Sequence, residues 1–439
     1  KDFFVNQSLL LVERARDDIR RGMPIILTDN INDKDGVSSE FKDYLLFSAE
    51  DFVAGPEIYL SLLADLGVSN VKMVVTWQRE KFLESATFLP DSEIPSCCAT
   101  GACRANADLP VDSSVQYNKQ RSNTQQNNKP QNNKPKVDSE SYICDIAINQ
   151  HENIAQHVHN IMVGKDNAEV SLKVGSAFTD IALKFIKLTQ FLPSIVIVPL
   201  GADQKDKVAN FINISAENIL DYYKLNKHQG YEYDLETVCN TQLKLSEVSK
   251  AKILSYRPKI GGSEHYALII GDPFKDKIPL VRMHSSCYTG DLLKSMTCDC
   301  YNQLHLAMKI MDQYYIDYNA GKESKFSGGI VLYLMQEGRG IGLTNKLRAY
   351  NFQAEGLDTV DANNIIGFNN DERDYTIASL ILENLAINQI SLLTNNPDKV
   401  KQLNTYNINI NQTIPLITPS NEYNKEYMKV KAERLNHKF

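Results

Sequence analysis

The sequence of 439 residues contains no run of eighteen apolar residues, so it predicts no membrane-spanning helix. Its first residues also lack the basic and then apolar pattern of a secretory signal. Positive charge is scarce, because 47 Lys and Arg stand against 54 Asp and Glu and leave a net charge of −7. This balance argues against a protein that mainly binds nucleic acid or an anionic membrane. We therefore expect a cytoplasmic protein with neither of these partners.

Hydrophobic residues make up 43% of the chain and charged residues 23%, which is typical of a globular protein with a buried core. Apolar runs predict buried strands at 195–200 and 329–335. Helical spacing of apolar residues predicts helices over 180–192, 302–315 and 343–355. Strands and helices linked by short loops indicate an α/β (or α+β) fold, and the length suits two or three domains.

A low-complexity segment interrupts the first half of the chain. Between Asn118 and Lys136, ten of nineteen residues are Asn or Gln. Such a segment has almost nothing to bury, so we expect a disordered insertion at about 104–140, within a loop of the N-terminal domain. We accordingly predict an N-terminal domain at 1–245 and a C-terminal domain at 246–439.

Three of the eight cysteines fall within fourteen residues, at Cys287, Cys298 and Cys300. Without a secretory signal, clustered cysteines suggest a metal site or catalytic groups before disulfides. Zinc takes thiolates in tetrahedral geometry, and three protein ligands with one open position are typical of a catalytic site. Two alternatives stay open: a structural site with His284 as fourth ligand, or three free cysteines in the core.

The other five cysteines carry no assigned chemistry. Cys97, Cys98 and Cys103 lie beside the polar insertion, and adjacent cysteines such as the first two rarely ligate one ion well. Cys144 and Cys239 are isolated, so we interpret them as core residues.

Three polar loops stand out in the C-terminal half, at 336–342, 370–374 and 394–399. The first and third follow predicted strands, and the second precedes an apolar helix. Glycines in the first and a hydroxyl and lysine in the third suit an anion held at a helix N-terminus. Arg282 and Arg348 add local positive charge to an acidic chain, which favours a small anionic ligand. The alternative is that these loops are ordinary capped turns.

Taken together, these segments resemble GTP cyclohydrolase II, the first enzyme of riboflavin synthesis. The resemblance covers residues 250–420, about 40% of the chain. The matching strings are Arg282–Cys287, Thr289–Asp291, Cys298–Cys300 with Gln303, Gln336–Arg339, Asn345–Tyr350, Asp358–Val360, Gly367–Phe368, Asp371–Asp374 and Leu393–Pro397.

The resemblance implies that Cys287, Cys298 and Cys300 bind one Zn²⁺. Zinc lowers the pKa of water to about 7 and would supply the nucleophile that attacks C8 of guanine and releases that carbon as formate. Diphosphate would leave with the help of Mg²⁺. The implied product is 2,5-diamino-6-(5-phosphoribosylamino)pyrimidin-4(3H)-one. The resemblance also implies a homodimer.

The resemblance gives roles to further residues. Arg373 matches the family's proposed nucleophile at the α-phosphate, Asp371 its proton acceptor, and Tyr350 a tyrosine near the ring chemistry. Because the pKa of arginine exceeds about 12, we favour an electrostatic role for Arg373, oriented by Asp371. The positions that match GTP contacts are Arg282, Met283, His284, Ser285, Ser286, Gln303, Glu337, Gly338, Arg339, Thr359, Thr394 and Lys399.

Two positions depart from the family pattern. Ser286 stands where the family commonly has Glu, and Gly340 where many members have Asn. Neither change touches a cysteine of the cluster or the pair of Asp371 and Arg373, so we expect activity. The alternatives are a nucleotide-binding or regulatory relative without turnover, and a bifunctional enzyme.

Residues 14–49 resemble the start of a 3,4-dihydroxy-2-butanone-4-phosphate synthase domain, which many members carry at the N-terminus. The acidic metal loop of that domain should be dense in Asp and Glu. Here Asp29, Asp33, Asp35 and Glu40 are spread among Asn, Ser and Gly. We find no counterpart of its later Gly-His-Thr-Glu motif. We therefore predict a degenerate, non-catalytic version of that domain.

Overall fold

The computed structural model of the chain shows two domains of mixed helices and strands, which confirms the predicted fold class. No helix in the described part of the chain is long and apolar enough to cross a membrane. The structure describes residues 7–31, 42–76, 139–148, 154–163, 172–225, 235–259, 261–354, 357 and 359–424.

The N-terminal domain is built on a seven-stranded sheet with the order β5-β4-β3-β6-β2-β1-β7. Neighbouring strands are antiparallel except β1 and β7, which are parallel. The strands are β1 (Ile25–Thr28), β2 (Asp43–Ser48), β3 (Asn70–Thr76), β4 (Ser141–Ala147), β5 (Leu172–Val174), β6 (Ser194–Pro199) and β7 (Asn213–Ser215). The described helices are α1 (Gln7–Arg20), α2 (Ala49–Ala54), α3 (Pro56–Asp65), α5 (Ile154–Val163), α6 (Ala177–Leu188), η4 (Ala202–Val208) and α7 (Ala216–Leu225).

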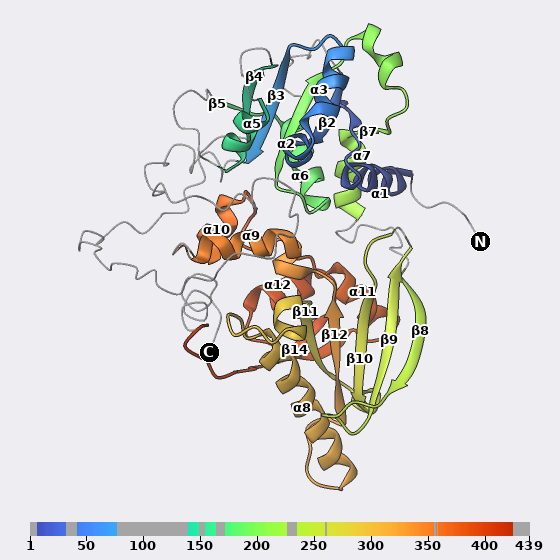
Figure 1. Cartoon of the computed structure of the whole chain (residues 1–439). Coiled ribbons are helices and arrows are strands. Elements are labelled where there is room, and N and C mark those ends of the chain that lie inside the picture. Colours follow the sequence, from blue (N-terminus) through green and yellow to red (C-terminus); the bar gives the residue numbers. More distant parts are fainter. Residues whose placement is uncertain are drawn as a thin grey trace.

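Helices cover both faces of this sheet (Figure 1). Alternate residues of a strand point to opposite faces, so Val196 of β6 packs with α2, α3 and α5, whereas Ile197 packs with α1, α6 and α7. Ser176 caps α6, and its backbone N–H donates to Thr179 Oγ1 at 2.7 Å. The helix ends at Leu188, four residues before its predicted end, because the chain turns through a positive φ of 64° at Gln190.

The C-terminal domain is built on a second seven-stranded sheet, ordered β14-β13-β11-β12-β10-β9-β8. The pairs among β14, β13, β11 and β12 are parallel, and the remaining pairs are antiparallel. The strands are β8 (Leu235–Leu243), β9 (Ala251–Pro258), β10 (His265–Gly271), β11 (Leu280–Ser285), β12 (Gly328–Leu334), β13 (Gln389–Leu393) and β14 (Asn409–Ile414). The helices are η5 (Pro273–Lys275), η6 (Tyr288–Leu292), α8 (Cys300–Asn319), η7 (Glu337–Gly340), α9 (Leu343–Ala354), α10 (Thr359–Ile365), α11 (Thr376–Asn384) and α12 (Pro397–Thr405).

Two core clusters hold this second sheet between helices. Val331 of β12 packs with Met311 of α8, whereas Leu332 on the other face packs with Ile381 of α11 and Leu403 of α12. Helices α9 and α10 lie apart from both layers, between the two domains (Figure 1). They carry residues of the C-terminal sequence motifs to the surface of the N-terminal domain.

The structure corrects one predicted boundary. We set the second domain at 246–439, but β8 pairs with β9 along the edge of the second sheet, so that domain begins before residue 246. The predicted insertion at 104–140 lies outside the described residues except for its last two. Cys97, Cys98 and Cys103 also lie outside them, as do Asp33, Asp35 and Glu40.

Candidate active site

A cleft opens at the carboxyl ends of the parallel strands β11, β12 and β13, where ligands bind in α/β sheets. It encloses about 1050 Å³ including its open mouth. Helices α9 and α10 and the start of α8 complete its wall. The lining residues are Arg282, His284, Ser285, Ser286, Cys287, Cys298, Asp299, Cys300, Gln303, Glu337, Gly338, Arg339, Ile341, Lys346, Ala349, Tyr350, Gln353, Thr359, Asn363, Arg373, Thr394, Asn395, Asn396 and Lys399.

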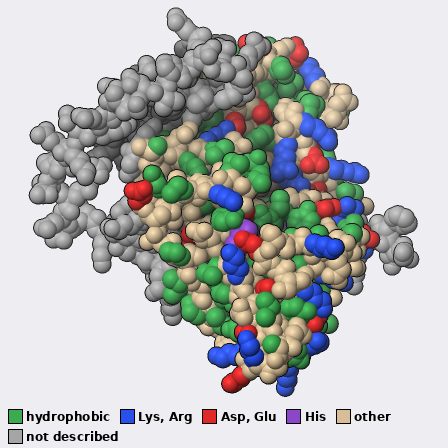
Figure 2. All heavy atoms as spheres, turned by 60° about the horizontal axis from the view of Figure 1, so that its bottom comes forward, with side chains coloured by type: hydrophobic (Ala, Val, Ile, Leu, Met, Phe, Trp, Pro, Cys, Tyr) green, Lys and Arg blue, Asp and Glu red, His purple; other side chains and the backbone are tan. Residues whose placement is uncertain are grey.

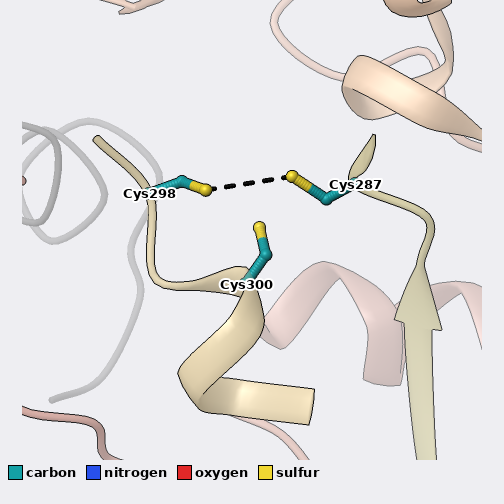
Figure 3. A group of neighbouring side chains, drawn as sticks. All are labelled: Cys287, Cys298 and Cys300. Carbon is teal, nitrogen blue, oxygen red and sulfur yellow. Dashed lines mark hydrogen bonds between the residues drawn. The ribbon is translucent and has the colours of Figure 1, made fainter. Parts of the chain in front are cut away.

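The three predicted cysteines meet at one side of this cleft. Their sulfur atoms lie within 4.8 Å of one another, and among the described residues they form the one group of potential metal ligands. Figure 3 shows Cys287 at the end of its strand, facing Cys298 and Cys300 at the start of α8. Cys287 and Cys298 are buried, and their sulfurs are 3.8 Å apart. Side chains from two separate elements thus lie together, as the spacing of the cysteines in the sequence predicted.

The surroundings of the cluster suit thiolates. Gly290 N–H donates to Cys287 Sγ at 3.3 Å, and a Cβ at Gly290 would lie 2.9 Å from the sulfurs of both Cys287 and Cys298. Lys346 Nζ also donates to Cys287 Sγ, at 3.0 Å. Hydrogen bonds from Cys298 and Cys300, followed by the charge of Lys346, lower the pKa of Cys287. The donor set and the glycine that makes room for it fit a thiolate metal site.

A buried carboxylate fixes the backbone that carries Cys287. Asp291 accepts from Cys287 N–H at 3.0 Å and from Tyr333 OH at 2.8 Å. His284 Nε2 donates to the same carboxylate at 3.0 Å, and burial lowers the pKa of His284. The structure does not support His284 as a fourth metal ligand, because Asp291 accepts from its Nε2 and the group of potential ligands among the described residues contains only the three cysteines.

Strand β11 supplies a buried arginine to the cleft. Arg282 donates to the carbonyl of Leu393 at 3.0 Å and to Gln303 Oε1 at 2.6 Å. Gln303 in turn donates to Asp299 Oδ2 at 2.6 Å. Burial lowers the pKa of Arg282 to about 10, so the guanidinium stays charged at neutral pH.

The loop after β12 folds tightly around Glu337. Its carboxylate accepts from Tyr288 N–H at 2.6 Å and from Lys346 Nζ at 2.8 Å. Arg339 has a positive φ of 61°, and its guanidinium donates to the carbonyl of Asn370 at 3.3 Å. The loop therefore links the cysteine side of the cleft to the loop that carries Asp371 and Arg373.

Asp371 and Arg373 form a two-point ion pair. Arg373 Nε donates to Asp371 Oδ1 at 2.8 Å, and a second guanidinium nitrogen bonds the other carboxylate oxygen. Burial opposes ionisation, but Arg373 outweighs it and lowers the pKa of Asp371. Arg373 lines the cleft, whereas Asp371 does not. This geometry matches our interpretation that Asp371 orients the arginine.

The other predicted site residues also gather at this cleft, apart from Met283. Its side chain is buried in the core, and its carbonyl accepts from Lys399 Nζ at 2.8 Å. The predicted contribution of Arg348 to a basic site is wrong, because its guanidinium binds Glu50 of the N-terminal domain. The residues that line the cleft as predicted are Arg282, His284, Ser285, Ser286, Gln303, Glu337, Gly338, Arg339, Tyr350, Thr359, Arg373, Thr394 and Lys399.

Sequence reasoning gave no role to Lys346 or Asp291. Lys346 lies within a matched string, and its spacing of four residues from Tyr350 places both on one helix face. Burial opposes its charge, but Tyr350, Glu337 and Cys287 outweigh burial and raise the pKa of Lys346. The helical spacing between Lys346 and Tyr350 was a signal for Lys346. No local pattern predicted the contact between Asp291 and Cys287.

The cleft is locally cationic in an acidic chain. Five basic side chains and two carboxylates line it, an excess of three positive charges before the cysteines ionise. On the described part of the face shown in Figure 2, basic, acidic and apolar side chains are instead interspersed. Positive charge is thus concentrated in a cleft of small-molecule size, as the sequence predicted.

Residues 236–415 match the family model of GTP cyclohydrolase II. A GTP cyclohydrolase-2 from Azospirillum brasilense is 38% identical over 264 residues, which cover 59% of this chain and 64% of that protein. The riboflavin biosynthesis protein RibBA of Synechocystis is 42% identical over 204 residues, covering 46% of this chain and 34% of the relative. These findings confirm the predicted resemblance of the C-terminal region to this family.

The chain spans about a third to two thirds of the length of these curated relatives. RibBX, a two domain 3,4-dihydroxy-2-butanone 4-phosphate synthase from A. baumannii, aligns over 93% of this chain with 15% identity and a TM-score of 0.28. A score this low supports no conclusion about either domain. The resemblance of the N-terminal domain to a synthase of this kind stays a prediction.

Proposed function

We propose that the chain is a GTP cyclohydrolase II, which opens the imidazole ring of GTP and releases formate and diphosphate in the first step of riboflavin biosynthesis. The observation that carries this proposal is the meeting of the cysteine cluster with Arg373, which Asp371 holds from outside the lining, at one cationic cleft. The two groups lie 71 positions apart or more in the sequence, counted from Cys300 to Asp371. Their convergence supports one substrate that uses both.

Zinc is the ion that best fits the cysteine cluster. Cys287, Cys298 and Cys300 would hold it as thiolates, and three protein ligands leave a position open for chemistry. When bound, zinc would make a water acidic enough to serve as nucleophile at neutral pH. Lys346 and Gly290 would stabilise the negative charge of Cys287 through the bonds they donate. Tyr350, which lines the cleft with its ring 5.6 Å from Lys346 Nζ, would contact the base.

The basic side chains of the cleft would bind the triphosphate. Arg282 and Lys399 are buried and held by backbone carbonyls, so their charges are fixed before the substrate arrives. Fixed charges stabilise a developing anion better than charges that must reorganise. Mg²⁺ on the triphosphate would help the departure of diphosphate. Thr394 lines the cleft, and its hydroxyl oxygen accepts from Asn396 N–H at 3.1 Å, so the hydroxyl hydrogen would be available to a phosphate oxygen.

Arg373 would act on the α-phosphate through its charge. Its side chain is held by Asp371 at two points, so the guanidinium has little freedom to move. A bound carboxylate also keeps this arginine protonated, which makes nucleophilic attack by a neutral guanidine unfavourable. Asp371 therefore serves best as the group that orients Arg373.

Ser286 replaces a carboxylate with a hydroxyl at the cleft wall, and its backbone N–H donates to the carbonyl of Leu334 at 2.8 Å. The smaller side chain removes negative charge near the substrate without disturbing the strand end. We also propose a homodimer and a cytoplasmic location, which size-exclusion chromatography with light scattering and cell fractionation would test.

The proposal is tested by incubating purified protein with GTP and Mg²⁺ and measuring formate and diphosphate together. We expect both products in equal amounts. GTP binding with zinc present but without formate would support a regulatory relative instead. Conversion of ribulose 5-phosphate by the same preparation would support a bifunctional enzyme and overturn our prediction of a non-catalytic N-terminal domain.

A further inference from the structure

Helix α9 has the cleft on one side and the N-terminal domain on the other. Lys346 and Tyr350 line the cleft. Ala349 also lines the cleft, yet it is 2% exposed and belongs to the same core cluster as Phe47 of β2. Phe368, which follows α10, is fully buried in that cluster as well. The wall of the cleft is therefore packed into the core of the other domain (Figure 1).

An ion pair fixes α9 from the N-terminal side. Arg348 donates to both carboxylate oxygens of Glu50, at 2.5 and 3.1 Å. The two side chains are 20% and 24% exposed, so solvent screens the pair only in part. Arg348 also donates to Asn345 Oδ1 at 2.8 Å, and Asn345 donates to the carbonyl of Gln190 at 2.7 Å. Glu50 and Gln190 of the N-terminal domain thus bind Arg348 and Asn345, which lie one turn apart on one face of α9.

A second ion pair reaches the loop that carries Asp371 and Arg373. Lys187 Nζ of α6 donates to Glu372 Oε1 at 2.7 Å. Glu372 stands between Asp371 and Arg373, and its backbone N–H donates to the carbonyl of Arg339 at 3.0 Å. Lys187 therefore contacts the one residue that separates the proposed catalytic pair.

The domains also approach each other closely at two glycines. A Cβ at Gly342 would lie 3.0 Å from the side chain of Gln190, and one at Gly367 would lie 3.0 Å from Thr76 Oγ1. Contacts this tight leave little room for one domain to slide over the other.

We propose that the N-terminal domain positions the wall of the nucleotide cleft, with Glu50 and Lys187 as its positioning residues. Glu50 holds α9 through Arg348 and so places Lys346 and Tyr350. Lys187 holds Glu372 and so places Asp371 and Arg373. This role presupposes the proposed function of the cleft, and it gives the N-terminal domain a task that needs no catalysis of its own.

The two residues should affect different kinetic constants. Glu50→Gln keeps the shape but removes the charge that binds Arg348, so we expect KM for GTP to rise about 10-fold with kcat nearly unchanged. Lys187→Gln loosens the loop of the proposed catalytic pair, so we expect kcat to fall about 10-fold with KM nearly unchanged. The matched controls are Glu57→Gln on α3 and Lys184→Gln on α6, both exposed, which should leave both constants unchanged.

A charge exchange separates positioning from a loss of folding. The double variant Glu50→Arg with Arg348→Glu restores an ion pair in reverse, so it should recover most of the affinity that Glu50→Arg alone loses. Equal kinetic constants for Glu50→Gln, Lys187→Gln and the wild type would overturn the proposal. So would a fall in kcat and a rise in KM that simply follow the melting temperature in all variants.

Hydrogen exchange keeps this test independent of turnover. Glu50→Gln should speed exchange of the backbone amides in 343–354 and weaken GTP binding measured by calorimetry, while the zinc content stays at that of the wild type. If the wild type releases no formate, the proposed function fails, yet exchange and calorimetry still decide the positioning role. Unchanged exchange in 343–354 and unchanged GTP binding would contradict it.

Discussion

The two domains share one architecture and differ in what their sheets do. Each has seven strands between layers of helices. In the N-terminal sheet all but one pair of neighbours is antiparallel, so loops leave from both ends. In the C-terminal sheet four neighbours are parallel, and the loops after β11, β12 and β13 meet at one edge. The described cleft with convergent ionisable groups lies at that edge.

The difference teaches that strand direction, more than sheet size, gathers reactive side chains. The carboxyl ends of neighbouring parallel strands lie side by side, so residues that are distant in sequence become neighbours there without a long connecting loop. The N-terminal sheet instead offers an apolar face, and helices α9 and α10 of the other domain occupy part of it. The C-terminal domain carries the cleft, and the N-terminal domain supplies a surface against which the wall of the cleft packs.

The largest effect should follow from loss of one cysteine of the cluster. Cys298→Ser removes a thiolate, so bound zinc and formate release should disappear together. The matched control in the other domain is Cys144→Ser, because Cys144 is also buried but has no cysteine partner in the described structure. Metal analysis and formate release measured on the same preparations check this. Cys298→Ser with full zinc and full turnover would mean that the cluster is not the metal site.

The next largest effect should come from the charge of Arg373. Arg373→Gln removes it and should lower kcat about 100-fold, as expected for loss of one preorganised electrostatic group. Arg373→Lys keeps the charge but cannot bind Asp371 at two points, so it should lose about 10-fold. Steady-state kinetics with GTP separate these outcomes. Equal, complete loss in both variants would favour arginine as a nucleophile over our electrostatic interpretation.

Substitution of one glycine in each domain allows the stability cost of backbone strain to be compared with and without a steric clash. Gly340 has a φ of 92°, and a Cβ there would lie 2.7 Å from the backbone oxygen of Glu372. Gly67 has a φ of 69° and open space around it. Gly67→Ala should cost about 1 kcal/mol of stability, and Gly340→Ala about 2–3 kcal/mol because the clash adds to the strain.

Denaturant unfolding of the two variants measures the difference. The same clash applies to Gly340→Asn, so the Asn that the family resemblance leads us to expect at this position should also be tolerated poorly here. An Asn or Ala variant at 340 as stable as Gly67→Ala would show that the backbone of Glu372 yields to the new side chain.

The smallest effects should be the opposite pH responses of a half-buried carboxyl, Asp51, and a buried imidazole, His265. Burial, and then the neighbouring Glu50, raise the pKa of Asp51 in the N-terminal domain to about 7 from 3.8. The unfolded carboxyl ionises first as pH rises, so this group lowers stability between about pH 4 and pH 7. Burial lowers the pKa of His265 in the C-terminal domain to about 4 from 6.5. The unfolded imidazole is protonated first as pH falls, so stability drops between about pH 6.5 and pH 4.

Melting temperatures at the two ends of these ranges check the signs. Asp51→Asn should raise the melting temperature at neutral pH by about 3 °C relative to acidic pH. His265→Gln should reduce the fall in melting temperature on acidification. It should change the melting temperature at neutral pH less. Variants that share one pH slope would contradict the assignment of opposite responses to the two domains.

The sequence allowed the cysteine cluster and most of the cleft to be predicted, because both depend on motifs at the ends of apolar strands. Cys287 lies two residues beyond β11, and Thr394 directly follows β13. Strand β8 was missed because all but its two end residues are exposed, so its sequence lacks the alternation that marks a half-buried strand. An edge strand of this kind forms through its pairing with β9, which local patterns do not encode.

The roles of Arg348 and Lys346 depend on packing between distant segments. Local sequence shows two basic residues two positions apart on one helix, and it does not show which faces the cleft. The N-terminal domain decides this by presenting Glu50 to Arg348, and Lys346 then faces Cys287 on another side of the helix. A local sequence motif does not predict interdomain contacts of this kind.

The most direct test of the central claim uses GTP labelled with ¹³C at C8, followed by nuclear magnetic resonance in the presence of Mg²⁺. The account predicts that the labelled carbon leaves as formate, with one diphosphate per formate, and that a zinc chelator stops both. Labelled carbon that stays in the purine ring while zinc is bound and GTP occupies the cleft would contradict it.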